Sequence, residues 1–201
     1  MTASPSRSRD AGYFAALYDA NPDPWNFEGS AYELRKYRAT LSALGGQQFN
    51  RALEVGCSIG VLTSLLAPRC VSLFAVDIVE SALAAARVRC AAMAQVEFAL
   101  LRVPEEWPAG QVFDLILLSE VLYFLTPADI GRVAAHVTNA LAPGGSVVLV
   151  NYTEQIDEPC SGDQAADVFI AATQAQLRVG LHERHQAFRI DRLQPCGSTR
   201  D

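Results

Sequence analysis

The sequence is poor in the features that mark nucleic-acid binders, membrane spans and metal centres. Its 16 Lys and Arg are outnumbered by 22 Asp and Glu, which gives a net charge of −6, whereas binding to nucleic-acid phosphates rests on clustered basic residues. No apolar run approaches the roughly 18 to 20 residues that span a bilayer. The five cysteines include no C-x-x-C pair, and no metal-ligand spacing stands out. We therefore expect no nucleic-acid partner, no membrane span and no metal.

The first ten residues also lack the apolar core of a secretory signal, and carry Ser, Pro and Arg instead. We expect these residues to form a mobile tail. An odd number of widely spaced cysteines fits reduced thiols. A cytoplasmic location is therefore expected.

What is present fits a single globular domain, with 50% of the 201 residues apolar and 19% charged. Strand-like and helix-like segments alternate at short intervals, which predicts an α/β fold with a doubly wound, Rossmann-like, mostly parallel seven-stranded sheet. Residues 1–46 should form the tail and a helical lid, 47–151 the core, and 152–201 a segment ending in an antiparallel hairpin. The expected helices are 11–20, 31–44, 61–67, 80–92, 127–141 and 163–175; the expected strands are 52–55, 72–76, 96–100, 113–118, 146–151, 177–187 and 188–193.

The central motif is an apolar strand that passes through Glu54 into a loop over residues 56–60 and then into a helix. The start of a helix offers unpaired backbone N–H groups and a partial positive charge, so a glycine loop there can hold a polar ligand close to the backbone. A dinucleotide fingerprint, G-x-G-x-x-G, would need glycine where Ser58 and Val61 stand, which weakens that interpretation. The residues of this predicted cradle are Gly56, Cys57, Ser58 and Gly60.

The same five residues also read G-x-S-x-G, the nucleophile elbow of α/β-hydrolases, with Ser58 as the nucleophile. Asp77 or Asp114, followed by His136 or His182, could complete a triad in the required chain order. Against this alternative, the loop follows the first strand of the sheet, so no earlier strand and helix supply a second oxyanion-hole donor.

Read as acid-x-Gly-x-small-x-Gly, the loop resembles that of class I S-adenosylmethionine (SAM) methyltransferases. Asp77 ends the second strand, 21 residues beyond Gly56, the spacing at which an acid accepts hydrogen bonds from ribose hydroxyls. After the third strand, many members of this class place an acid that accepts from the adenine amino group. This chain has Arg102 there, which has no acceptor, so we expect adenine to be read by backbone groups around Arg102 and Val103 and by packing against Ile78.

Further candidates lie after the fourth strand and ahead of the sheet. Ser119 and Glu120 follow the fourth strand, where Glu120 should lie near the transferred methyl and remove a proton, with Tyr123 orienting it. In the N-terminal segment, a cation can reach the methionine carboxylate of the cofactor while aromatic rings exclude water. These N-terminal candidates are Trp25, Tyr32, Arg35 and Lys36.

The chain also contains D-P-W at 23–25, L-E-V-G-C at 53–57, L-L-A-P-R-C at 65–70, F-D-L-I at 113–116, S-E-V-L-Y-F-L at 119–125 and L-A-P-G-G at 141–145. Together these motifs resemble the NodS-like family of SAM-dependent methyltransferases, over about residues 11 to 151. Membership implies SAM as cofactor, S-adenosylhomocysteine (SAH) as product, no metal, and a small acceptor such as an amino sugar that is N-methylated. O-methylation of a sugar or metabolite, SAM binding without transfer, and hydrolysis at Ser58 remain the alternatives.

The acceptor itself is expected near the fifth strand. Asp157, Glu158 and Asp163 follow that strand, with Tyr152 beside them. Carboxylates there would attract a cationic amine, which fits an amino sugar. Asp163 is accordingly a candidate for the catalytic set.

Overall fold

The strands form one sheet in the order β3-β2-β1-β4-β5-β7-β6, in a computed structural model that describes residues 6–197. The first five strands along the chain are parallel, and β7 runs antiparallel to both β5 and β6. The predicted doubly wound sheet with a C-terminal antiparallel hairpin is thus confirmed. The strands are β1 (Phe49–Val55), β2 (Cys70–Asp77), β3 (Val96–Leu100), β4 (Phe113–Ser119), β5 (Leu141–Tyr152), β6 (Leu177–Arg184) and β7 (Phe188–Pro195).

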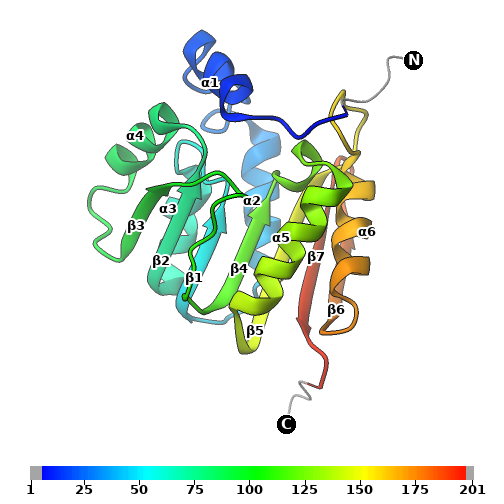
Figure 1. The fold of residues 1–201 in the computed structure, drawn as a ribbon. Helices are drawn as coiled ribbons and strands as arrows, with labels where there is room; N and C mark the ends of the chain where they lie inside the picture. The colour runs from blue at the N-terminus through cyan, green and yellow to red at the C-terminus, as the bar shows by residue number, and fades with distance from the viewer. Residues whose placement is uncertain (1–5, 198–201) are drawn as a thin grey trace.

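The helices cover both faces of the sheet (Figure 1). Buried residues of α2 and α3 pack on one face, and those of α5 and α6 pack on the other. α1 lies across the edge where the parallel strands end, so the N-terminal segment covers the ligand-binding edge of this fold. The helices are α1 (Ala11–Ala20), α2 (Ala31–Ala43), α3 (Val61–Leu66), α4 (Glu80–Arg89), α5 (Pro127–Ala140) and α6 (Gly162–Thr173), with 3-10 turns η1 (Ala67–Arg69) and η2 (Leu122–Phe124).

Short polar residues fix where these helices begin. The Asp10 side chain accepts from the Tyr13 backbone N–H at the start of α1, and Ser30 accepts from the Glu33 N–H at the start of α2. Ser30 and Glu33 have the spacing of a capping box, but only half of it forms, because the Glu33 carboxylate contacts Lys36 instead of turning back to Ser30. The Glu33 side chain is therefore available to the site described below.

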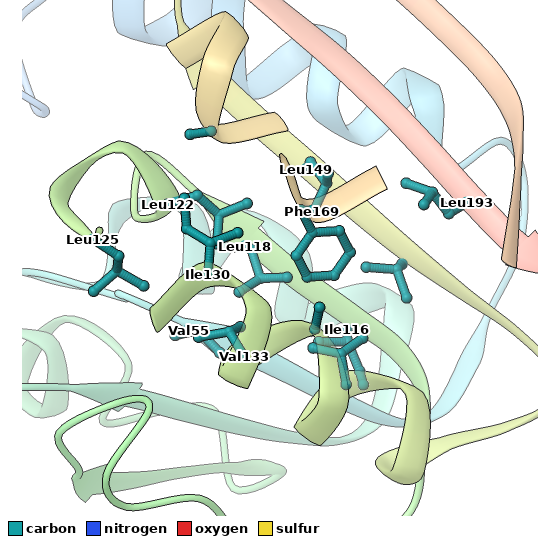
Figure 2. Close-up of a cluster of buried hydrophobic side chains, with 14 of the residues drawn as sticks. Val55, Ile116, Leu118, Leu122, Leu125, Ile130, Val133, Leu149, Phe169 and Leu193 are labelled. Atoms are coloured by element: carbon teal, nitrogen blue, oxygen red, sulfur yellow. The ribbon is translucent and has the colours of Figure 1, made fainter. Parts of the chain in front are cut away.

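The larger hydrophobic core lies between the sheet and helices α5 and α6 (Figure 2). Ile116, Leu118 and Leu149 project from β4 and β5 toward Phe169 of α6, and all four are fully buried. Burial of each such side chain contributes about 1.5–3 kcal/mol to stability. This rigid core fixes the carboxyl ends of β1, β4 and β5, which carry the candidate site.

Most expected bounds differ from the observed ones by up to three residues, and the structure departs further from the expectations at two places. β5 begins at Leu141 rather than at residue 146, because Leu141 already pairs with Phe113 ahead of a bulge in the β4–β5 ladder. The N-terminal residues that we expected to be mobile are anchored from Ser8 onward. Ser8 Oγ accepts from the Thr126 N–H at 2.9 Å, and the Arg9 N–H donates to the Phe124 carbonyl. Residues 1–5 of that predicted tail lie outside the described residues.

Candidate functional site

A cavity of about 600 Å³ opens at the carboxyl ends of β1, β2 and β4, beneath α1 and α2. Its walls combine the loop after β1, the end of β2, the end of β4 and one face of the N-terminal helices. This is the edge at which open α/β sheets bind ligands. The sequence-predicted residues that line the cavity are Trp25, Tyr32, Lys36, Glu54, Gly56, Cys57, Ser58, Asp77, Ile78, Val103, Ser119, Glu120 and Tyr123.

The backbone conformation of the loop after β1 limits which residue types can occupy it. Gly56 and Ser58 have φ of 77° and 51°, and a Cβ on Gly56 would overlap the side chain of Val121. The Asp77 carboxylate secures the loop by accepting from the Ser58 N–H at 2.8 Å and the Val79 N–H at 3.0 Å. Burial raises the pKa of Asp77, while these backbone bonds oppose the rise.

Gly60 has a packing role that the sequence did not indicate. Its φ is 79°, and a Cβ there would lie 2.9 Å from the Ala86 Cβ of α4. It is not among the residues that line the cavity. Its glycine therefore allows α3 and α4 to approach each other, rather than letting a ligand approach the backbone as we expected.

Glu54 is a buried acid on the wall of the cavity. The residue is only 2% exposed, and its Oε2 atom has no hydrogen-bond partner. Burial raises the pKa of this carboxyl to about 8. Near neutral pH, the group therefore takes its charged form most readily when a cation or donor is placed beside it.

This raised pKa makes a prediction for stability. Below the unfolded-state pKa of 4.5, the Glu54 carboxyl is protonated in both the folded and the unfolded state, so its burial as an acid does not depend on pH there. As pH rises toward about 8, the unfolded chain loses the proton first and the folded state is progressively destabilised. The melting temperature of Glu54→Gln should therefore rise relative to that of the ligand-free wild type as pH increases through this window. Exposed Glu97→Gln is the control; a gap independent of pH would contradict the assignment.

A group of charged and polar side chains from the end of β4, η2 and α2 also lines the cavity. Glu120 has φ of 60°, and its N–H donates to the Val150 carbonyl, which fixes the residue at the strand end. The Tyr123 hydroxyl donates to Glu120 Oε2 at 2.6 Å. Lys36 Nζ lies 3.3 Å from Glu120 Oε1 and 2.9 Å from Glu33 Oε1. Two carboxylates thus share one ammonium inside the cavity wall.

This group retains acceptor capacity. Glu33 and Lys36 are 5% and 2% exposed, and Glu33 Oε2 and Glu120 Oε1 have no hydrogen-bond partner. Burial raises the pKa of Glu33, and the neighbouring Lys36 opposes that rise. Lys36 is thus committed to two carboxylates, in contrast to the expectation that it would contact a methionine carboxylate.

Sequence reasoning missed Arg9, Tyr13 and Tyr18 as residues of the cavity wall, because their partners are distant in the chain. Arg9 Nε lies 2.6 Å from Glu158 Oε2, and the Tyr13 hydroxyl donates to the other oxygen of Glu158 at 3.0 Å. Tyr18 hydrogen-bonds through its hydroxyl to Ser58 Oγ. All of these residues line the cavity, so α1 and the loop after β5 are joined directly over it.

Three predicted site residues lie elsewhere. Arg35 is exposed on α2 and Arg102 lies in a separate, smaller hollow. Asp163 pairs with Arg184 at 2.6 Å and with Arg189 at 3.2 Å. None of the three is among the residues that line the main cavity, so we withdraw Asp163 from the catalytic candidates and Arg35 from the cofactor candidates.

The histidines also lie away from Ser58. His136 stacks on Trp107, His182 pairs with Asp191, and His185 stacks on Phe188. The structure therefore brings no histidine to the serine of the G-x-S-x-G sequence. Within residues 6–197 there is also no group of three metal-ligating side chains, and no helix long and apolar enough to cross a membrane.

Comparison with known proteins places the chain in a family. The family model described as Nodulation protein S (NodS) matches residues 17–188. The chain belongs to the NodS family. This membership confirms the resemblance drawn from the motifs at the ends of β1 and β4.

Individual members of the NodS family are moderately similar in sequence. Nodulation protein S of Sinorhizobium fredii is 34% identical over 70% of this chain, which spans 64% of that relative's length. The Bradyrhizobium diazoefficiens relative is 30% identical over 81% of the chain and 78% of its own length. The crystal structure of N-methyltransferase NodS from Bradyrhizobium japonicum WM9 in complex with SAH has a TM-score of 0.79 at 21% identity. It covers 93% of this chain and 99% of that one.

Proposed function

We propose that this NodS-family chain is a SAM-dependent methyltransferase that N-methylates an amine of a small acceptor. The observation that carries the proposal is the position of Glu120. Its carboxylate is held by Tyr123 and Lys36 in the wall of the cavity that also contains the 56–60 loop and Asp77. One cavity thus offers a cofactor cradle and, in the wall beside it, an ionisable group.

The residues of the cavity fit SAM. Asp77 has a carboxylate with lone pairs remaining after its two backbone bonds, and would accept from the ribose hydroxyls. The unpartnered buried oxygen of Glu54 would accept from the ammonium of the methionine moiety, directly or through water. Trp25 and Tyr32 would exclude water from the bound cofactor. When bound, SAM supplies an electrophilic methyl group on a sulfonium.

The charge of the cavity favours a cationic acceptor. Five acidic side chains line it, against the two basic side chains of Arg9 and Lys36. An acceptor ammonium has no lone pair until it loses a proton, and Glu120 is placed to attract the ammonium and take that proton. Tyr123 orients the carboxylate, and the buried walls hold acceptor and methyl group in line. A phosphorylated or carboxylated acceptor would be repelled. The acids are Glu33, Glu54, Asp77, Glu120 and Glu158.

The similar proteins support the same assignment. The structural neighbour from Bradyrhizobium japonicum is named as an N-methyltransferase and binds SAH, and the sequence relatives are named as nodulation proteins. An amino sugar of the kind modified during nodulation-factor synthesis fits the acidic cavity. We propose such an amino sugar as the acceptor class.

The test combines binding with turnover. SAM and SAH should bind with Kd values on the order of micromolar in calorimetry, whereas NAD should show no comparable affinity. With SAM present, SAH should accumulate when glucosamine or chitosan oligosaccharides are added. Matched N-acetylated sugars, which lack a free amine, should give none. Equal turnover of the N-acetylated sugars would establish O-methylation, and comparable binding of NAD would overturn the cofactor assignment.

A further inference from the structure

Lys36 divides its contacts unequally between the two carboxylates beside it. Its Nζ donates a hydrogen bond to Glu33 Oε1 at 2.9 Å. Its approach to Glu120 Oε1, at 3.3 Å, is an ion pair without a hydrogen bond. The Tyr123 hydroxyl holds the other oxygen of Glu120. Glu33 therefore keeps the ammonium, and Glu120 Oε1 keeps its capacity to accept.

The two acids also differ in their access to the cavity. The Glu120 side chain is 15% exposed, whereas the Glu33 side chain is 7% exposed. The aromatic ring of Tyr32 covers the ammonium of Lys36, with its centroid 5.1 Å from Nζ. Of the two acids, Glu120 is thus the more open to a ligand in the cavity, and Glu33 is the more enclosed.

The charges of this cluster do not balance. When both acids are ionised, two carboxylates face the single ammonium of Lys36, in a wall where an uncompensated charge is costly. Burial raises the pKa of the phenols that also face Glu120, so these groups stay uncharged near neutral pH. The phenols are Tyr32 and Tyr37 of α2 and Tyr123 of η2. The cluster therefore has room for one additional cation.

We propose that Glu33 is a positioning residue, which takes over the charge of Lys36 when the ammonium of the acceptor binds Glu120. The inference rests on the proposed function. Glu33 Oε2 has no hydrogen-bond partner, so Lys36 can turn wholly to Glu33 and release Glu120 Oε1 to the acceptor. Two cations then face two carboxylates. Without the Glu33 charge, Lys36 and the acceptor would compete for Glu120 alone.

The experiment measures KM and kcat for glucosamine, by SAH release, in the wild type and three variants. Glu33→Gln should raise the acceptor KM by about tenfold or more, the range for a hydrogen bond to a charged group, and should change kcat much less. Glu33→Asp keeps a carboxylate and should recover most of the loss. When Lys36→Met is added to Glu33→Gln, the competing ammonium is gone, and KM should return to within about threefold of the wild type.

Recovery through the second substitution separates positioning from a merely structural role. Lys36→Met removes the remaining ion-pair partner of Glu120, so it would add to a structural loss instead of reversing it. A wild-type KM in Glu33→Gln would overturn the inference. A double variant whose KM is no better than that of Glu33→Gln would overturn it as well.

Calorimetry with SAM and SAH tests the other cation that could use the charge, which is the sulfonium of SAM. Glu33→Gln should leave the ratio of SAM to SAH affinity at its wild-type value. A selective loss of SAM affinity would show that the sulfonium needs Glu33, and would overturn the inference. If the wild type forms no SAH with glucosamine or chitosan oligosaccharides, the proposed function fails instead, so the two failures are distinguishable.

Discussion

Glu120→Gln should lower kcat by about 10²–10⁴-fold, the range for loss of a general base, while SAH affinity stays near that of the wild type. The amide keeps the size of the side chain and can still accept from the Tyr123 hydroxyl, which donates at 2.6 Å in the native protein. It cannot take a proton from an ammonium, and it removes the negative charge that attracts one. The measurement is SAH release from SAM and glucosamine, alongside calorimetry with SAH.

The matched control is Glu158→Gln, which removes another acid that lines the cavity. Glu158 is paired with Arg9 and Tyr13 and follows β5, where the acceptor is expected, so its loss should alter the acceptor KM more than kcat. The residual activity of Glu120→Gln should rise with pH, because more acceptor amine is then already unprotonated. A kcat close to that of the wild type in Glu120→Gln would contradict the proposed role.

The sequence predicted the sheet-edge part of the site well, for a topological reason. Glu54, Asp77 and Glu120 each end or follow a parallel strand, and parallel strands in one sheet bring their carboxyl ends to the same edge. Spacing along the chain therefore located these residues without any knowledge of side-chain contacts. The same logic cannot rank residues that reach the cavity from outside the sheet.

Helix α2 shows where that limit lies. The buried face of α2 contains Glu33, Lys36, Tyr37 and Thr40, at the i, i+3, i+4 and i+7 spacing of a helix face. Because most of these residues are polar, a search for apolar periodicity overlooks them, and Arg35 was judged equivalent to Lys36. The sequence shows that these four residues share one face of the helix. It does not show that a face carrying charged side chains is buried.

Long-range ion pairs were beyond prediction altogether. Arg9 and Glu158 are separated by 149 residues, and neither stands in a motif. Asp163 was expected to face the acceptor because it follows β5, but the turn into α6 and the hairpin strands bring Arg184 and Arg189 to it. Charge alone could not indicate which acid would be neutralised within the protein.

Lys36→Met should destabilise the protein by about 3–5 kcal/mol at neutral pH, the usual cost of removing one partner of a buried ion pair. Methionine fits the space of the lysine stem but leaves Glu33 and Glu120 buried beside each other without the ammonium that now lies 2.9 and 3.3 Å from them. The measurement is the free energy of unfolding in urea. Arg35→Met, on the exposed face of the same helix, should change stability by no more than about 0.5 kcal/mol.

The pH dependence of that loss identifies its cause. Burial already raises the pKa of Glu33 in the wild type, with Lys36 opposing the rise, so removing Lys36 should raise it further. An acid with a raised folded-state pKa does not affect stability below its unfolded-state pKa. It destabilises the fold increasingly as pH rises from that value to the folded-state pKa. The gap between Lys36→Met and wild type should therefore widen with pH from about 5 upward. Adding Glu33→Gln should recover much of the loss, because one of the two uncompensated charges is then gone. A gap that is the same at every pH, with no recovery in the double variant, would mean that the lysine stem stabilises α2 by packing and that its charge does not.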